Sequence, residues 1–146
     1  MRKEISQDYA NKFNFVKTLQ PYVLVTSGGR SGTDFLQSLL DGHHEVLTFN
    51  GHIKLYTEFF IESKCLKNKP IDLYDLAHEF YGLYIEKFKS RYDYIERKDK
   101  LGKNGDDTLN IDSETFINSF VCLLNNQKHT KKNILLAIYA AYHESL

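Results

Sequence analysis

The stretch that decides the predicted fold is residues 22–46, which read YVLVTSGGRSGTDFLQSLLDGHHEV. It opens with a short apolar, β-branched run at 22–26, which is typical of a buried strand in a parallel sheet. A glycine-bearing loop follows at 27–33. Phenylalanine and leucine then recur at helical spacing until Asp41-Gly42, a helix-stop signal. The order of strand, loop and helix predicts the first unit of an α/β fold.

A second short strand is expected at 45–49, so that residues 22–50 form a strand-loop-helix-strand unit. The sequence turns helical from residue 53 to 146. Apolar stripes predict helices over 53–60, 73–95 and 116–124, and a last helix from about residue 130 to the end. Asp72 is the expected N-cap of the second of these helices, and Asp112 or Ser113 that of the third. The fold class we expect is therefore α/β, with a P-loop-like parallel-sheet core followed by a mostly helical region.

Composition narrows the class of protein. The 146 residues carry 19 basic and 19 acidic side chains, and the formal net charge is zero. Without a basic tail, neither nucleic acid nor an anionic membrane is expected as a partner.

Cys65 and Cys122 are too few for a disulfide framework or a zinc site, and we expect both to be packing residues. No histidine pair has metal-ligand spacing, so no metal site is predicted. With no signal peptide or membrane span in the sequence, we expect a cytoplasmic protein.

The loop at 27–33 has the composition of an anion-binding loop. A helix N-terminus presents unpaired backbone N–H groups and partial positive charge, and glycines at 28, 29 and 32 let the backbone approach a phosphate or sulfate closely. Arg30 adds a permanent cation that can bind an oxyanion through two hydrogen bonds. Ser31 and Thr33 add hydroxyl donors. The loop is not a Walker A sequence, because Gly28 and Gly32 are only four apart and no lysine follows.

These residues resemble the opening motif of the sulfotransferases that use 3′-phosphoadenosine-5′-phosphosulfate. That motif runs from a strand through Gly-x-Pro-Arg-Ser-Gly-Thr-Thr into an apolar helix that ends Leu-Asp-x-His-Pro-x-Val. Residues 30–33, Arg-Ser-Gly-Thr, match its centre, and 40–46 match its second half, in which His43 would cap or pack at the helix end. The resemblance covers about 30 of the 146 residues. It departs from the family at Gly29, where proline is usual, at His44, and at Asp34, where a second threonine is usual.

The resemblance implies transfer of a sulfuryl group from this nucleotide to a hydroxyl or amine acceptor. Gly28, Gly29, Ser31, Gly32, Thr33 and Asp34 would line the 5′-phosphosulfate site. Arg30 would stabilise the charge that develops on the bridging oxygen, which is electrostatic catalysis. Asp34 would either repel the nucleotide or face away and suit the first helical turn. In several branches of the family a Glu or His 20–30 residues after the motif's basic residue is the general base, which indicates Glu58 or His52 here.

The family also has a later Arg- and Ser-bearing segment for the 3′-phosphate, and no such segment follows in this sequence. We therefore expect an incomplete sulfotransferase-type fold, with residues 1–146 as a single, partial domain. Three hypotheses stay open: a sulfotransferase whose remainder lies outside this chain, a truncated non-catalytic relative, and a nucleotide or phosphoryl-transfer enzyme of another lineage. The acceptor would be a carbohydrate or another small molecule, and a homo-oligomer is possible through an exposed sheet edge or the apolar C-terminal helix.

Overall fold

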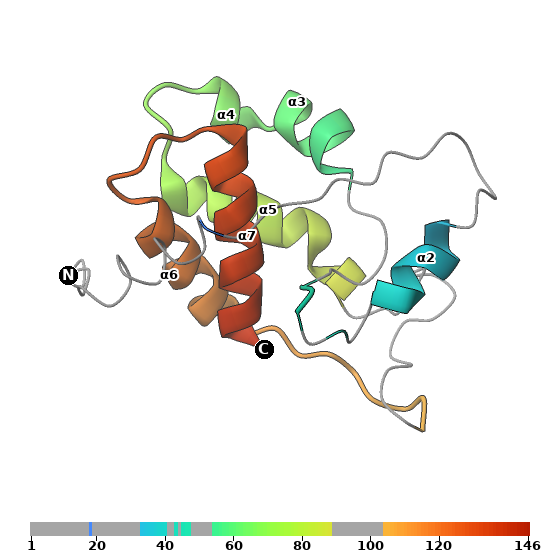
Figure 1. Cartoon of the computed structure of the whole chain (residues 1–146). Coiled ribbons are helices and arrows are strands. Elements are labelled where there is room, and N and C mark those ends of the chain that lie inside the picture. The colour runs from blue at the N-terminus through green and yellow to red at the C-terminus, as the bar shows by residue number, and fades with distance from the viewer. Residues whose placement is uncertain (1–17, 19–32, 41–42, 44, 48–53, 89–103) are drawn as a thin grey trace.

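The computed structural model describes residues 18, 33–40, 43, 45–47, 54–88 and 104–146. Its helices are α2 (Thr33–Leu40), the single π-helical turn η1 (Leu55–Phe59), α3 (Phe60–Glu62), α4 (Lys64–Lys67), α5 (Leu73–Phe88), α6 (Ser113–Leu124) and α7 (Lys131–Ser145). Figure 1 shows α5, α6 and α7 gathered together, the short helices η1 to α4 above them, and α2 to one side.

The predicted α/β fold is wrong for the part of the chain that the structure describes. Of those residues, 68% are helical and 1% are strand, and they contain no sheet, so neither the P-loop-like parallel-sheet core nor the incomplete sulfotransferase-type fold is found. Residues 45–47, placed in the second strand, are exposed and form a turn, in which the Val46 N–H donates to the His43 carbonyl at 3.0 Å. A short β-branched run becomes a strand only when a neighbouring strand pairs with it. The first predicted strand, 22–26, lies outside the described residues.

Side-chain caps set the starts of the three long helices. Asp72 Oδ1 accepts hydrogen bonds from the backbone N–H groups of Tyr74 and Asp75, which confirms it as the cap of α5. Asp112 Oδ2 accepts from the Thr115 N–H at 2.7 Å, and Thr130 Oγ1 accepts from the Asn133 N–H at 3.2 Å. These bonds satisfy backbone donors that a helix leaves unpaired in its first turn. The predicted starts of α6 and α7 are confirmed.

The helix α6 packs against both α5 and α7, and α6 and α7 are antiparallel. The backbone N–H of Asp112, at the start of α6, donates to the carbonyl of Ser145, at the end of α7, at 3.1 Å. The hydroxyl of Tyr81 on α5 donates to the carbonyl of Ile111 at 3.0 Å. The first bond joins α7, and the second joins α5, to the segment just before α6.

Aromatic rings form the centre of the core, as their spacing predicts. Phe80 of α5 is fully buried and lies between Phe59 and Phe116, with ring centroids 5.3 and 5.9 Å away. Phe116 stacks on Phe120, one turn later on α6, at 6.4 Å. Because each of these rings buries a large apolar area, this cluster supplies much of the hydrophobic stabilisation of the bundle.

The segment from 54 to 67 contains more elements than the single helix predicted over 53–60. It folds as η1, α3 and α4, with Leu55, Phe59 and Phe60 buried against the bundle. The break falls at Ser63, whose backbone leaves helical geometry with ψ of 123° and whose hydroxyl accepts from the Leu66 N–H at 3.1 Å. Serine competes in this way with the helical hydrogen-bond pattern, so a new helix starts after it.

Candidate functional site

The structure describes only part of the predicted anion site. Residues 28–32, which include Gly28, Gly29, Arg30, Ser31 and Gly32, lie outside the described residues, and so does His52. Thr33 and Asp34 are the first two residues of α2, so the helix begins directly after the glycine-bearing loop, as its spacing predicts. The side chains of these two residues are not described. The structure therefore gives the position of the motif's helix, whereas residues 28–32 of the predicted ligand site lie outside the described residues.

The end of α2 carries the second half of the motif. The His43 N–H donates to the carbonyl of Leu40, the last residue of α2, at 3.2 Å. The Nδ1 atom of His43 accepts from the Glu45 N–H at 3.2 Å. His43 thus closes the helix and holds the turn after it, in keeping with its expected place at the helix end.

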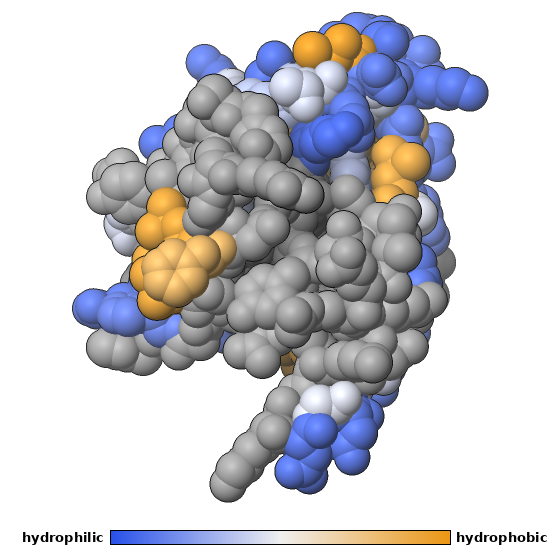
Figure 2. Space-filling view, turned by 90° about the vertical axis from the view of Figure 1, so that its right-hand side faces the viewer, coloured by the Kyte–Doolittle hydropathy of each residue, from blue (hydrophilic) through white to orange (hydrophobic). Residues whose placement is uncertain are grey.

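One face of α2 is apolar and exposed in the described part of the chain. Phe35 is 69% exposed, and Leu39 is 60% exposed. Figure 2 views the molecule from the side on which α2 lies and shows apolar side chains among mostly hydrophilic described residues. Apolar residues at this spacing are usual on a helix that packs on a core, so they do not by themselves indicate a chemical site.

Glu58, one of the two predicted general bases, lies on η1 in an ion pair. Its Oε1 atom is 2.6 Å from Nζ of Lys54, four residues earlier; the Lys54 side chain is exposed and that of Glu58 is half-buried. The hydrogen bond and the charge of Glu58 raise the pKa of Lys54 above its usual value. A surface ion pair of this spacing contributes little to stability, because water screens both charges.

One carboxylate, that of Glu79, accepts several hydrogen bonds between α4 and α5. The sequence patterns did not indicate this contact. Glu79 Oε2 accepts hydrogen bonds from the Ser63 hydroxyl at 2.5 Å and from the Cys65 N–H at 3.3 Å, and its Oε1 accepts from the Lys64 N–H at 3.0 Å. All the donors are at the start of α4, where backbone N–H groups are unpaired. We interpret Glu79 as a structural anchor that ties this short helix to α5.

Both cysteine thiols are protonated at neutral pH. Burial, together with the hydrogen bond and charge of Glu79, raises the pKa of Cys65 to about 11. Burial also raises the pKa of Cys122. Because only the thiolate is a strong nucleophile, these environments make both side chains poor nucleophiles and agree with the interpretation of both as packing residues.

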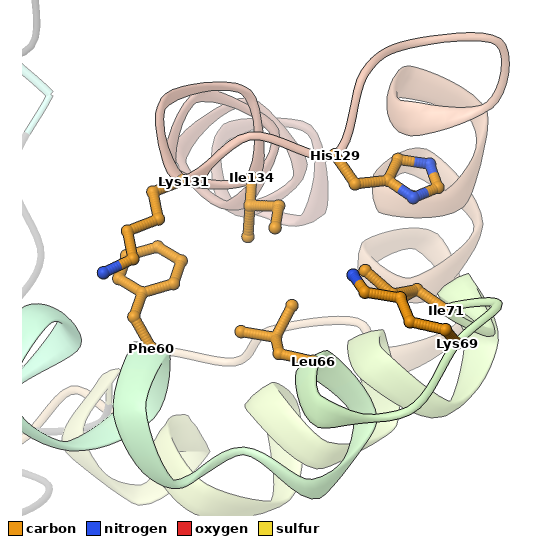
Figure 3. Close-up of a pocket in the computed structure, with 7 residues that line it drawn as sticks. All are labelled: Phe60, Leu66, Lys69, Ile71, His129, Lys131 and Ile134. Carbon is orange, nitrogen blue, oxygen red and sulfur yellow. The ribbon is translucent and has the colours of Figure 1, made fainter.

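A pocket of about 180 Å³ opens between α3, α4 and the start of α7. Figure 3 shows Leu66 and Ile134 facing each other across it, Phe60 and Lys131 at one end, and Lys69 and His129 at the other; Ile71 completes the lining. Sequence patterns did not indicate this pocket. The sequence shows the lysines at 67–70 and the His129-Thr130-Lys131 run. No pattern within either segment indicates that the two meet in the fold.

Neither a metal-binding cluster in the described residues nor a similar known protein indicates what the site binds. In the described ranges no group of three or more His, Cys, Asp or Glu side chains could hold a metal ion. No described helix is long and apolar enough to cross a membrane. No protein-family model, curated protein or solved structure matches the chain. Any function assigned to the chain therefore depends on the motif at 25–46 and on the geometry around it.

Proposed function

We propose that this protein binds 3′-phosphoadenosine-5′-phosphosulfate through residues 27–34 and transfers its sulfuryl group to a hydroxyl or amine acceptor. The observation that carries the proposal is the position of α2. It begins at Thr33, the last residue of the Arg-Ser-Gly-Thr match, and ends at Leu40, where the second half of the motif starts. The two halves of the motif thus flank one helix, which is the arrangement that a phosphate-binding loop followed by a helix requires.

Electrostatics supports the same proposal. The N-terminal end of a helix carries partial positive charge, which at α2 would favour an anion. Arg30 precedes this end by three residues in the sequence and gives the motif a permanent positive charge. Together they provide what transfer of a sulfuryl group needs most, which is preorganised positive charge beside the bridging oxygen.

The binding step is tested with the reaction product, 3′-phosphoadenosine-5′-phosphate, and a pair of arginine variants. Arg30→Ala should weaken binding by about tenfold or more, because a hydrogen bond to a charged group contributes about 1.5–3 kcal/mol. Arg97→Ala is the matched control, since it removes the same charge outside the motif, and should bind like the unchanged chain. Equal affinities of the two variants would contradict the proposal.

The transfer step depends on a general base, for which Glu58 and His52 are the candidates. If Glu58 is the base, Glu58→Gln should abolish transfer to a panel of phenol, amine and carbohydrate acceptors without changing product-nucleotide affinity. If His52 is the base, His52→Gln should have this effect instead. Lys54→Met removes the ion-pair partner of Glu58. If Glu58 is the base, this variant should retain transfer.

The ion pair favours a second candidate function, nucleotide binding without transfer. Glu58 is the one predicted base that lies in the described part of the chain, and its carboxylate is within 2.6 Å of the Lys54 ammonium. In this pair the Lys54 ammonium occupies the carboxylate oxygen that a general base would offer to the proton of the acceptor. In this case the product nucleotide binds, Arg30→Ala weakens that binding, and no acceptor in the panel is sulfated.

A further inference from the structure

A turn at Asn104-Gly105 begins the described segment that leads to α6. Both residues and the three that follow them are exposed. Figure 1 shows this segment (orange) extending away from α5, α6 and α7. The φ of Gly105 is +72°, in the left-handed region that glycine adopts readily, and a Cβ at this position would meet no atom within 4 Å. The junction between the two residues is therefore open to solvent.

Two groups that can react with each other meet at this junction, the side-chain amide of Asn104 and the backbone N–H of Gly105. In the part of the chain that the structure describes, neither group takes part in a hydrogen bond. A hydrogen bond fixes the direction of an amide and occupies its donor, so both groups here are free to approach each other. Glycine also has no Cβ that would hinder the approach.

The asparagines of the long helices are held differently. Asn118 lies inside α6, where the N–H of the next residue, Ser119, belongs to the helical hydrogen-bond pattern. The side-chain amide of Asn133, on α7, donates to the Lys128 carbonyl at 2.8 Å. In each case the fold occupies one of the two groups that would have to react. Asn104 has neither constraint.

From these observations we infer that Asn104 is a site of spontaneous deamidation. The backbone nitrogen of Gly105 attacks Cγ of Asn104, and the bond from Cγ to Nδ2 breaks. Ammonia leaves with the proton of the Gly105 N–H, and a succinimide ring remains. Water, the only other reactant, then opens the ring at either carbonyl, which gives aspartate or isoaspartate and one new negative charge. The inference is independent of the proposed nucleotide site, because the turn lies outside the motif at 25–46.

Peptide mapping by mass spectrometry follows the reaction in the full chain, incubated at neutral and at mildly alkaline pH. Chymotryptic cleavage after Phe116 separates Asn104 from Asn118, and fragment ions assign the modified position. The peptide with Asn104 should gain the mass of an amide-to-acid change and resolve into two chromatographic forms, whereas Asn118 should stay an amide. Asn50-Gly51, the other Asn-Gly pair in the sequence, is followed in a separate peptide.

The same chain unfolded in guanidinium gives the rate that each asparagine has without the fold. Asn104 should react in the folded chain within about tenfold of its unfolded rate, a barrier difference of at most about 1.4 kcal/mol. Unfolding should accelerate the reaction at Asn118, because it releases the Ser119 N–H from the helix. A folded-state rate at Asn104 below this range, or equal protection of both asparagines, would overturn the inference.

A pair of glycine variants tests the role of the neighbouring residue. Gly105→Ala places a methyl group beside the attacking nitrogen and should slow the reaction at Asn104 by about tenfold or more. Gly82→Ala on α5 is the matched control, because Gly82 is also exposed and a Cβ there also meets no atom within 4 Å. It should leave the rate at Asn104 unchanged, and circular dichroism should report the same helix content for both variants. Equal rates in the two variants would contradict attack by the Gly105 nitrogen.

Discussion

Ser63 and Glu79, sixteen residues apart in the chain, are joined by a hydrogen bond of 2.5 Å from the serine hydroxyl to Oε2 of the carboxylate. Ser63 is buried, and the same hydroxyl accepts the Leu66 N–H at the start of α4. One serine thus caps a short helix and fastens it to α5. Since α4 has only four residues and could not persist alone, this contact helps to hold α4 against α5.

We expect Glu79→Gln to lower the free energy of unfolding by about 1–3 kcal/mol, because hydrogen bonds to a charged, partly buried group are stronger than those to an amide. Chemical denaturation measures the change. Glu62→Gln is the matched control, since Glu62 is exposed on the adjoining helix α3. It should alter stability by less than about 0.5 kcal/mol. Equal effects of the two variants would show that the anchor contributes nothing.

The pH dependence of stability tests the same contact. Burial raises the pKa of Glu79, but the hydrogen bonds from Ser63, Lys64 and Cys65 together outweigh it and hold this pKa below its usual 4.5. A carboxyl with a lowered pKa in the folded state stabilises the fold above the unfolded value and loses this contribution as the pH falls through the folded one. The stability difference between the unchanged chain and Glu79→Gln should therefore be largest at neutral pH and shrink below about pH 4.5. A difference that stays constant in acid would rule out the carboxylate as its source.

Phe80 should be among the most costly core residues to truncate. It is fully buried and contacts the rings of Phe59, Tyr84 and Phe116 at centroid distances of 5.0–5.9 Å. Phe80→Ala should destabilise the protein by about 3–5 kcal/mol, through lost burial and the cavity left behind. Leu83→Ala on the same helix is the control, because Leu83 is 59% exposed and should cost far less. Similar midpoints for both variants in thermal unfolding would contradict the orientation of α5 in the bundle.

Thiol labelling tests the environment of Cys65. With its pKa raised to about 11, this thiol should react with a disulfide reagent much more slowly at neutral pH than an ordinary thiol with a pKa of about 8.5. The variant Cys122→Ser isolates the signal of Cys65. Unfolding in denaturant should restore the ordinary rate. Fast labelling of the folded variant would mean that the Cys65 thiol is neither buried nor next to the Glu79 carboxylate.

The parts of the fold that sequence patterns predict correctly are those that depend on near neighbours. The starts of α6 and α7 follow from Asp112 and Thr130, whose capping bonds reach only three residues along the chain. Core membership of Phe80 and Phe116 follows from helical spacing. Residues 45–47 of the second predicted strand do not form a strand, because strand formation needs a partner that local sequence cannot supply.

In the candidate sites, too, features that depend on near neighbours are predictable from the sequence, and contacts between distant segments are not. The start of α2 at Thr33 is predictable, because a glycine-bearing loop and a helical stripe adjoin there. The Glu79 anchor and the pocket at Lys69 and His129 are not, since each joins segments that only the folded chain brings together. Glu58 is predicted as a base from its distance to Arg30 in the chain, and that distance contained no information about its ion pair with Lys54.

Calorimetric titration of the chain with 3′-phosphoadenosine-5′-phosphate, in parallel with ATP, tests the proposed function most directly. The two nucleotides both carry 5′-phosphate, but only the first matches the co-substrate that the motif implies. We predict that it binds more tightly than ATP and that Arg30→Ala removes most of this binding. Tighter binding of ATP, or no binding of the bisphosphate, would contradict the assignment of residues 27–34 as a phosphosulfate site.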